Sequence, residues 1–393
     1  MGNTFKLAVM GALGLVLGFL GGKFDFEDGV LPPWPLFTVG VAVNDALAAA
    51  FEATTPPKVR AIDLATGYWQ SSVTYAVVKH GIVDAVAGGE ATCEGVAAAR
   101  ALAAGYCCRY MAAAAELGIF ARSGDAYALT AVGAAVSDGA DSMRDFVLMI
   151  NEESAAAWRA TAATSMASGA SGFREAFGSD FFEWHAERTH AAQWAQFDRA
   201  MGAMSADLTS ALAADYAVDP AATICDVGGG RGHVLAKFLD RHDNASGLVL
   251  DLPDAADRAT ENLARFGGRG AAVGGSFFDA FPPAFRACDV FVVRGVLMDW
   301  PDAEATTILR RVAQAAKPGA KLVVNEFVLG TAGKMMERAK HLMDLNMAAS
   351  CAPGARVRAV ADHRALLEAA GVDLASFSHL RIRSIVDVLE VTF

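Results

Sequence analysis

The residues with the clearest capacity for chemistry form a glycine-rich turn, "DVGGGRG", from Asp226 to Gly232. The turn follows an apolar run and opens a helical pattern, and glycines at such a place let the backbone approach a ligand closely. Asp251 closes the next apolar run, 23 residues after Gly228, where a carboxylate at the end of a strand can bind ribose hydroxyl groups. Together these residues indicate a site for an adenosine-type ligand.

The turn does not match the common phosphate-binding patterns. A P-loop needs Gly-Lys followed by Ser or Thr after its glycines, and here the chain continues with Arg231, Gly232 and His233. The spacing of "GGGRGH" also departs from the GxGxxG pattern, so a nicotinamide dinucleotide remains only an alternative. The six cysteines show no CxxC pair and no metal-ligand spacing, which predicts reduced thiols, no disulfide framework and no metal site.

Two groups of elements must position these residues. From Ala61 to about Ala135 the apolar spacing is helical, and "IFARSGDAYALT" places a turn between two short strand-like runs. Helices followed by a hairpin predict a winged-helix-like layout, with helical spacing continuing to about residue 215. Strands and helices then alternate, which predicts an α/β domain with a parallel, doubly wound sheet. We therefore expect one domain at 61–215 and another at 216–393.

Composition and charge favour small-molecule chemistry. The 393 residues suffice for two domains and an extension, and 54% of them are hydrophobic, with much alanine that favours helix. A net charge of −11 argues against nucleic acid as a partner, because such binding needs clustered Lys and Arg.

The first 60 residues form a separate segment. Leu7 to Leu20 are fourteen apolar residues behind Lys6, short of the roughly 20 that a membrane-spanning helix needs. We expect a targeting segment or membrane anchor in an intracellular protein, cytoplasmic or organellar, with an extra packed helix as the alternative. The proline-rich "LPPWP" and "TTPPK" predict a linker up to about residue 60.

From residue 61 onward the chain resembles the class I S-adenosylmethionine-dependent methyltransferases, in particular the caffeate-type and bacterial small-molecule O-methyltransferases. "GYWQSSVTYAVVKHGIVDAV" is similar to their dimerisation helix and "FFEW…FDRAMGAMS" to their substrate-lining helix. "DVGGGRGHVL", "LDLPD", "GGSFFDAFP", "VRGVLMDWPD", "KLVVNEFVL" and "RALLEAAG" follow in the family's order. The resemblance implies a Rossmann-like domain with a mostly parallel seven-stranded sheet, preceded by a helical, winged-helix-like dimerisation domain. It also implies a homodimer and the cofactor S-adenosyl-L-methionine.

The resemblance assigns roles around the cofactor. It implies that Gly228 and Gly230 line the amino-acid portion, that Asp251 holds the ribose, and that two rings flank the adenine. Ser276 stands where the family usually has the Asp that binds the adenine amino group. The full expected cofactor set is Ser205, Asp226, Gly228, Gly230, Asp251, Leu252, Ser276, Phe277, Arg294 and Trp300. The expected acceptor set is Asn151, Trp158, Phe197, Met201, Met204, Met347 and Arg356.

The catalytic base of the resembling enzymes is missing. Their His, which removes a proton from the accepting hydroxyl, is replaced by Met298, and the Glu that orients it falls on Val357. Only Asp299 and Glu326 remain as acids at family positions. A thioether sulfur cannot act as a general base at neutral pH, so the site lacks the expected imidazole.

Three hypotheses account for the missing base. The preferred one is a thioether acceptor without a proton, such as 4-methylthio-2-hydroxybutyrate in the dimethylsulfoniopropionate branch of the family. Aromatic faces such as Phe197, Trp158 or Trp194 could stabilise the resulting sulfonium, and Arg356, Arg358 or His185 could bind the acceptor's carboxylate. The second hypothesis is a hydroxyl acceptor methylated by proximity or with Asp299 as base. The third is a catalytically inactive cofactor-binding dimer that acts as a scaffold or regulator.

Overall fold

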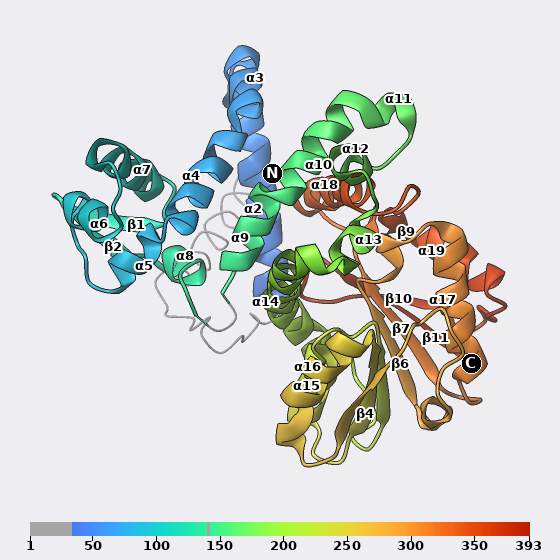
Figure 1. The fold of residues 1–393 in the computed structure, drawn as a ribbon. Helices are drawn as coiled ribbons and strands as arrows, with labels where there is room; N and C mark the ends of the chain where they lie inside the picture. The colour runs from blue at the N-terminus through green and yellow to red at the C-terminus, as the bar shows by residue number, and fades with distance from the viewer. Residues whose placement is uncertain (1–33, 140–141) are drawn as a thin grey trace, which may run out of the picture.

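The computed structural model describes residues 34–139 and 142–393, and its elements form two lobes joined by helices (Figure 1). The apolar segment expected at residues 7–20 lies outside the described residues. A helical lobe comes first in the chain, and the lobe that contains the large sheet lies at the carboxyl-terminal end.

The first lobe is a cluster of short helices with a small hairpin. Its buried side chains, among them Val78, Met111 and Phe120, form a core of their own. The expected hairpin forms, with Phe120 paired to Leu129, while the winged-helix assignment stays a prediction. The elements are α4 (Tyr68–Lys79), α5 (Ile82–Ala87), α6 (Cys93–Ala99), α7 (Ala104–Glu116), β1 (Phe120–Ser123), β2 (Ala126–Leu129) and α8 (Ala131–Ala135).

Further helices connect the two lobes. α14 (Ala191–Asp215) is the longest of them at 25 residues and packs against both α9 and α15. The others are α9 (Arg144–Asn151), α10 (Glu153–Ala160), the π-helical turn η2 (Thr161–Ser165), α11 (Met166–Ser168), α12 (Gly172–Phe177), α13 (Phe181–Ala186) and the 3₁₀ turn η3 (Arg188–His190).

The second lobe contains a seven-stranded sheet in the order β10-β11-β7-β6-β3-β4-β5. Only β11 runs against its neighbours, so the mostly parallel seven-stranded sheet is confirmed. The strand order reverses beside β3, where β4 lies on one side and β6 on the other, and ligands of such sheets bind at the carboxyl ends of the strands there. The strands are β3 (Thr223–Val227), β4 (Ser246–Asp251), β5 (Gly270–Gly274), β6 (Val290–Arg294), β7 (Lys321–Glu326), β10 (Ser378–Arg381) and β11 (Asp387–Thr392).

Helices cover both faces of the sheet because its strands alternate their side chains between two cores. In β6, Val292 joins the core with α14, α15 and α16, and Val293 joins the core with α17 and α19. The remaining elements are α15 (His233–Arg241), α16 (Pro253–Leu263), η4 (Ala264–Phe266), η5 (Pro283–Ala287), η6 (Leu297–Asp299), α17 (Asp302–Ala315), β8 (Val328–Leu329), α18 (Lys334–Ser350), β9 (Arg358–Ala359) and α19 (Val360–Ala369).

The segment expected to be a linker is largely helical instead. α2 (Trp34–Thr54) and α3 (Pro57–Thr66) occupy it, because the prolines stand before or at the first turns of helices, where a missing N–H costs nothing. Within the described ranges, α2 is the one helix long and apolar enough to span a membrane by length and composition. It packs along α18.

The prediction of reduced cysteines is also wrong for four of the six. Disulfides join Cys93 to Cys108 and Cys225 to Cys288, while Cys107 and Cys351 are free. The partners lie 15 and 63 residues apart in the sequence, separations that carry no recognisable pattern. Folding brings their Cα atoms to 4.9 and 5.9 Å, which is within the range that a disulfide requires.

Candidate functional site

The glycine turn lies directly after β3, with Asp251 beside it at the end of β4. Gly228 and Gly230 have φ values of +72° and +54°, conformations that glycine adopts without strain. The Asp251 carboxylate accepts hydrogen bonds from the backbone N–H of Gly230 and of Leu252, each at 2.7 Å. Burial raises the pKa of Asp251, and these two donors oppose the shift. The acid therefore fixes the turn on which a ligand would lie.

A buried charge pair lies beneath this turn. Asp226 is 1% exposed, and its Oδ2 has no hydrogen-bond partner. Burial raises its pKa to about 7, against the opposing charge of Arg294. Arg294, at the end of β6, donates from one terminal nitrogen to Ser205 Oγ at 3.1 Å, and its Nε has no partner. Both groups thus keep polar atoms that can bind a ligand.

One face of α14 closes over the turn. Asp198 accepts hydrogen bonds from Arg231 in the turn, at 2.9 and 2.7 Å, and pairs with Arg258 of α16 at 3.0 Å. Asp198, Gly202 and Ser205 are four and three residues apart, a spacing that places them on one helix face. Sequence reasoning selected Ser205 and missed Asp198, although this spacing could have revealed it.

The expected adenine-flanking rings do lie close together. The ring centroids of Phe277 and Trp300 are 6.0 Å apart with an interplanar angle of 81°. Trp300 also stacks on Phe182 of α13 at 5.6 Å and 8°. Ser276 accepts a hydrogen bond from the backbone N–H of Phe278 at 3.2 Å, so its hydroxyl shapes the local turn.

The segment that carries Met298 is held from two sides. Glu326, at the end of β7, accepts hydrogen bonds through Oε1 from the N–H groups of Val296, Leu297 and Met298 at 3.0, 2.6 and 3.3 Å. Arg358, fully buried, donates to the carbonyls of Leu297 and Trp300 at 2.6 and 2.8 Å. Glu326 therefore positions the turn, and burial raises its pKa to about 7.

Met298 lies in an apolar setting rich in sulfur. It is 7% exposed and shares a core with Met347, Cys351 and Val357, so both positions of the lost base pair are apolar in the fold. The Cys351 thiol lies 3.9 Å from Met347 Sδ and 3.9 Å from Asp299 Oδ1. Sequence reasoning did not select Cys351, because no motif marks it.

Asp299 forms no ion pair with any residue that the structure describes, and its Oδ1 lies 3.9 Å from the Cys351 thiol. Burial raises its pKa to about 8, and the nearby charge of Glu326 adds to the shift. A carboxyl group with this pKa changes its charge just above neutral pH. It can therefore exchange a proton in the range where enzymes usually work.

The expected acceptor residues fall into two groups. Trp158 of α10 donates from Nε1 to Asn346 Oδ1 of α18 at 2.8 Å, which ties the two helices together near Met347. Asn346 was not selected from the sequence. Phe197, Met201 and Met204 follow one another along α14 at helical spacing. Asn151 of α9 accepts a hydrogen bond from the Ser71 hydroxyl of α4 at 2.8 Å, so its amide oxygen joins these two helices.

The candidates for an acceptor carboxylate are already engaged. Arg356 pairs with Asp302 and Asp362 at 3.1 and 3.3 Å, and Arg358 donates to Asp302 as well as to the backbone. His185 is 3% exposed, and burial lowers its pKa, which favours the neutral imidazole. Arg358 and His185 are therefore poorly placed to offer a positive charge to an acceptor, and the role expected of Arg356 stays a prediction.

His185 occupies the centre of an aromatic cluster on α12, α13 and α14. Its ring centroid lies 4.2 Å from that of Phe181 and 5.9 Å from that of Trp194. Its Nδ1 contacts the Phe181 carbonyl oxygen at 2.8 Å, while Nε2 is buried without a partner. The N–H therefore lies on Nδ1 and the free lone pair on Nε2.

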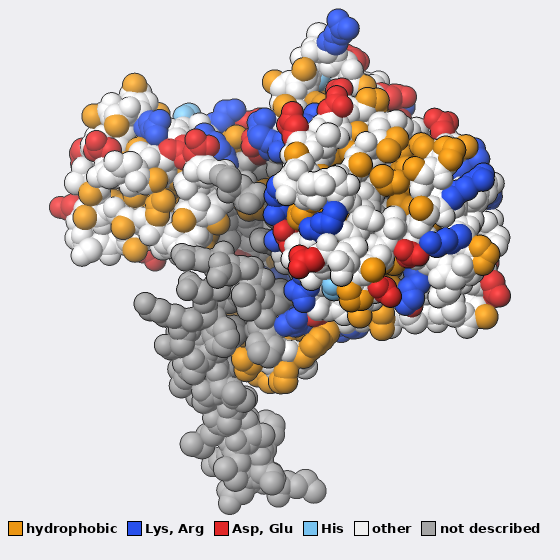
Figure 2. All heavy atoms as spheres, turned by 90° about the horizontal axis from the view of Figure 1, so that it is seen from below, with side chains coloured by type: hydrophobic (Ala, Val, Ile, Leu, Met, Phe, Trp, Pro, Cys, Tyr) orange, Lys and Arg blue, Asp and Glu red, His pale blue; other side chains and the backbone are white. Residues whose placement is uncertain are grey.

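The distribution of charged side chains on the surface agrees with the expectation that nucleic acid is not a partner. On the face in Figure 2, Lys and Arg side chains are interspersed with Asp and Glu, without the broad basic stripe that a nucleic-acid footprint requires.

The site residues fit S-adenosylmethionine. A Cβ at Gly228 would lie 2.7 Å from Val296 Cγ2, so the turn leaves no room for a side chain next to the ligand position. Asp226 Oδ2 and Arg294 Nε are buried polar atoms of opposite charge without partners, as a ligand with both ammonium and carboxylate groups needs.

Comparisons with known proteins agree with this site. An O-methyltransferase domain profile matches residues 158–373, and an O-methyltransferase dimerisation domain profile matches residues 62–137. The chain is 30% identical to phenazine O-methyltransferase PhzM of Lysobacter antibioticus, over 68% of this chain and 78% of the relative. It is also 30% identical to 3-amino-4-hydroxybenzoate 4-O-methyltransferase of Streptomyces cremeus, over 83% and 88% of the two chains.

Solved structures show the same architecture. The crystal structure of LaPhzM superimposes with a TM-score of 0.76 at 27% identity, covering 86% of this chain and 99% of that one. The human N-acetylserotonin methyltransferase in complex with SAM, at 22% identity, shares the fold with a TM-score of 0.74 over 86% and 98% of the chains. None of these comparisons supports membrane attachment. The chain belongs to the O-methyltransferase family and is an S-adenosylmethionine-dependent methyltransferase.

Proposed function

We propose that the protein methylates a phenolic hydroxyl of a small aromatic molecule, with Asp299 as the general base in place of the absent His. The observation that carries the proposal is the Asp299 carboxyl group, half-buried next to Met298, with its pKa raised by desolvation to about 8. When bound, S-adenosylmethionine supplies an electrophilic methyl group. The acceptor oxygen would form its bond to that methyl group as the methyl–sulfur bond breaks and S-adenosylhomocysteine leaves, and the hydroxyl proton would pass to the Asp299 carboxylate.

The raised pKa matches a phenol better than an aliphatic alcohol. A phenolic group such as that of Tyr has a pKa near 10, only about two units above that of Asp299. An ordinary aspartate, with a pKa near 4, would be a much weaker base for the same proton. The burial of this carboxyl group therefore offsets part of the loss of the imidazole.

The relatives favour an oxygen acceptor over sulfur. Their printed names describe O-methyltransferases of a phenazine and of a hydroxybenzoate, and one N,N-dimethyltransferase of 8-amino-8-demethylriboflavin. None of these names describes a thioether acceptor, so the thioether hypothesis and the dimethylsulfoniopropionate role have no support there. The aromatic cluster around His185 favours a flat acceptor, because ring pairs stabilise such a ligand by about 0.5–1.5 kcal/mol each.

The test is methyl transfer from labelled cofactor to a panel of phenols, aliphatic alcohols and thioether acids between pH 6 and 9.5. We expect phenols to react, with a rate that rises about tenfold per pH unit and levels off above about pH 8, where Asp299 is ionised. Asp299→Asn should slow transfer by about 10²- to 10⁴-fold and remove this pH dependence, with cofactor affinity retained in calorimetry.

Asp243→Asn is the matched control, because it removes the same charge from an exposed position in the loop before β4. It should leave the profile unchanged. An unaltered pH profile in Asp299→Asn would exclude this residue as the base, and reaction of thioether acids alone would restore the sulfur hypothesis. No turnover with any acceptor class would favour the inactive scaffold.

A further inference from the structure

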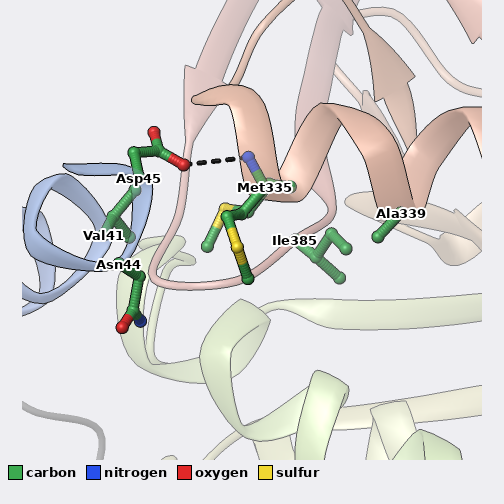
Figure 3. Close-up of a pocket in the computed structure, with 7 residues that line it drawn as sticks. Val41, Asn44, Asp45, Met335, Ala339 and Ile385 are labelled. Atoms are coloured by element: carbon green, nitrogen blue, oxygen red, sulfur yellow. Dashed lines mark hydrogen bonds between the residues drawn. The ribbon is translucent and has the colours of Figure 1, made fainter. Parts of the chain in front are cut away.

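α2 lies before both domain profiles and is attached to α18 by polar contacts. Asp45 Oδ1 accepts a hydrogen bond from the backbone N–H of Met335 at 2.8 Å (Figure 3). Lys334 forms an ion pair with Glu52, about two helical turns after Asp45 on α2. A Cβ at Gly333 would overlap the Asp45 carboxylate, so glycine at this position permits the close contact.

Asp45 acts as a helix cap supplied by another helix. α18 begins after Gly333, which has no side chain to accept from the first N–H groups. A carboxylate placed there satisfies one of these donors and interacts favourably with the positive end of the helix dipole. Val41, Met335 and Ala339 line a small apolar hollow beside this contact (Figure 3).

The other side of α2 exposes large apolar side chains. Leu47 is 64% exposed and Phe51 is 52% exposed, although both are of types that folding normally buries. No residue of α2 is buried. The exposure continues along α3 and into α4, through Val59, Ile62, Leu64, Tyr68 and Trp69, which are 52–68% exposed.

Along the chain, these exposed apolar residues lead directly into the dimerisation domain. The dimerisation profile begins at residue 62, within α3, so Ile62, Leu64 and the α4 rings belong to the domain through which family members pair. Leu47 and Phe51 extend the same exposed series backwards along the chain. Large apolar side chains that succeed one another in exposed positions along one stretch of chain indicate an interaction site.

The polar residues of α2 favour a protein over a membrane as its cover. Asn44, Asp45 and Glu52 lie in the middle and second half of the helix, and charged groups there would be costly in hydrocarbon. The two acids also hold α2 along α18.

We infer that α2 is a dimerisation arm, fixed to α18 by Asp45 and Glu52, whose Leu47 and Phe51 are covered by a second copy of this chain. The arm enlarges the interface beyond the dimerisation domain itself. Because α18 carries Met347 and leads to Cys351 beside Asp299, the arm also joins the interface to the helix that lines the site. The inference does not depend on the identity of the acceptor.

The test is the sedimentation mass of the full chain across a dilution series. Wild type should be a dimer, and Leu47→Asp with Phe51→Asp should raise the dimer dissociation constant at least 100-fold, because two buried apolar side chains become charged. Ala46→Asp is the matched control, since it introduces the same charge at an exposed α2 position roughly 100° around the helix from both Leu47 and Asp45. This variant should remain dimeric.

Hydrogen exchange of the unaltered protein gives a second measurement. Amides of residues 43–54 should lose protection on dilution below the dissociation constant, while those of α15 should not. Equal dissociation constants for the double variant and wild type, or α2 protection that is independent of dilution, would overturn the inference. Flotation of the wild type, but not the double variant, with phosphatidylcholine vesicles would show a membrane as the cover and would overturn it as well.

Discussion

At the scale of single residues, the chemistry of the site depends on carboxyl groups that are withdrawn from water. Asp226, Asp299 and Glu326 all have pKa values raised to about 7 or 8, and burial is the largest cause for each. A buried carboxyl without a full ionic partner prefers to hold its proton. Met298 and Val357 contribute to this effect, because apolar side chains at the family base positions leave no imidazole there to stabilise a negative charge.

Gly228 and Gly230 provide a prediction at this scale, because both have positive φ but only one is crowded. Gly228→Ala adds strain of about 1–2 kcal/mol and also forces a shift of Val296, whose Cγ2 would lie 2.7 Å from the new Cβ. Gly230→Ala has the conformational cost alone, since no atom lies within 4 Å. Urea unfolding should show the larger loss of stability for Gly228→Ala. Calorimetry should show the larger loss of cofactor affinity in the same variant, and equal effects would contradict this account of the turn.

At the scale of elements, the short turn η6 depends on neighbours that are distant in the sequence. Its N–H groups bond Glu326 of β7, and its carbonyl oxygens bond Arg358 of β9. A single 3₁₀ turn has too few internal hydrogen bonds to define its own position. The two buried side chains therefore hold Met298 and Asp299 against the ends of the strands.

Two substitutions at Glu326 distinguish the role of its hydrogen bonds from the role of its negative charge. Glu326→Ala leaves three N–H groups without their acceptor, at about 1–3 kcal/mol for each donor that stays unsatisfied. We expect chemical denaturation to show marked destabilisation and transfer to fall strongly. Glu326→Gln keeps a carbonyl acceptor, so it should fold stably and lower the pKa of Asp299, because a negative neighbour is removed. The rising limb of the pH–rate profile should then move to lower pH, and an unmoved limb would disprove the coupling.

At the scale of the whole molecule, the sequence was sufficient to predict the order of elements in the second lobe. Apolar runs predict buried strands, and the glycine turn after such a run predicts the start of a helix. The parallel sheet, and the positions of Gly228 and Asp251 at the ends of two strands, could therefore be predicted. The hairpin at residues 120–129 followed from its Ser-Gly-Asp turn for the same reason.

Features that depend on distant contacts could not be predicted in this way. From the sequence, Arg358 was a candidate to bind the acceptor's carboxylate, and only the folded chain shows that it is fully buried against Leu297 and Trp300. The disulfides and the contact between Trp158 and Asn346, 188 residues apart, arise in the same manner. The proline-rich stretches at both ends of α2 predicted a linker, whereas its contacts with α18 arise only in the folded chain.

The buried carboxyl groups also predict how the stability of the whole molecule depends on pH. Asp226, Glu326 and Asp299 bind protons in the folded state up to about pH 7, 7 and 8, whereas in the unfolded chain they lose them near pH 4. Their contribution to stability is complete below the unfolded pKa and is lost as pH rises through the folded pKa. The buried His185 and His363, with lowered pKa values, oppose this effect at lower pH, and their opposition fades between pH 6.5 and 8 as the unfolded histidines lose their protons.

Urea unfolding at steps of half a pH unit should therefore show a free energy of unfolding that falls between pH 6.5 and 8. Asp299→Asn should reduce the slope by up to about 1.4 kcal/mol per pH unit, because one carboxyl no longer exchanges its proton. The exposed Asp243→Asn should leave the slope unchanged. A slope that is flat or positive in wild type would mean that these three carboxyl groups are ionised in the folded protein, and Asp299 would then be too weak a base for a phenol.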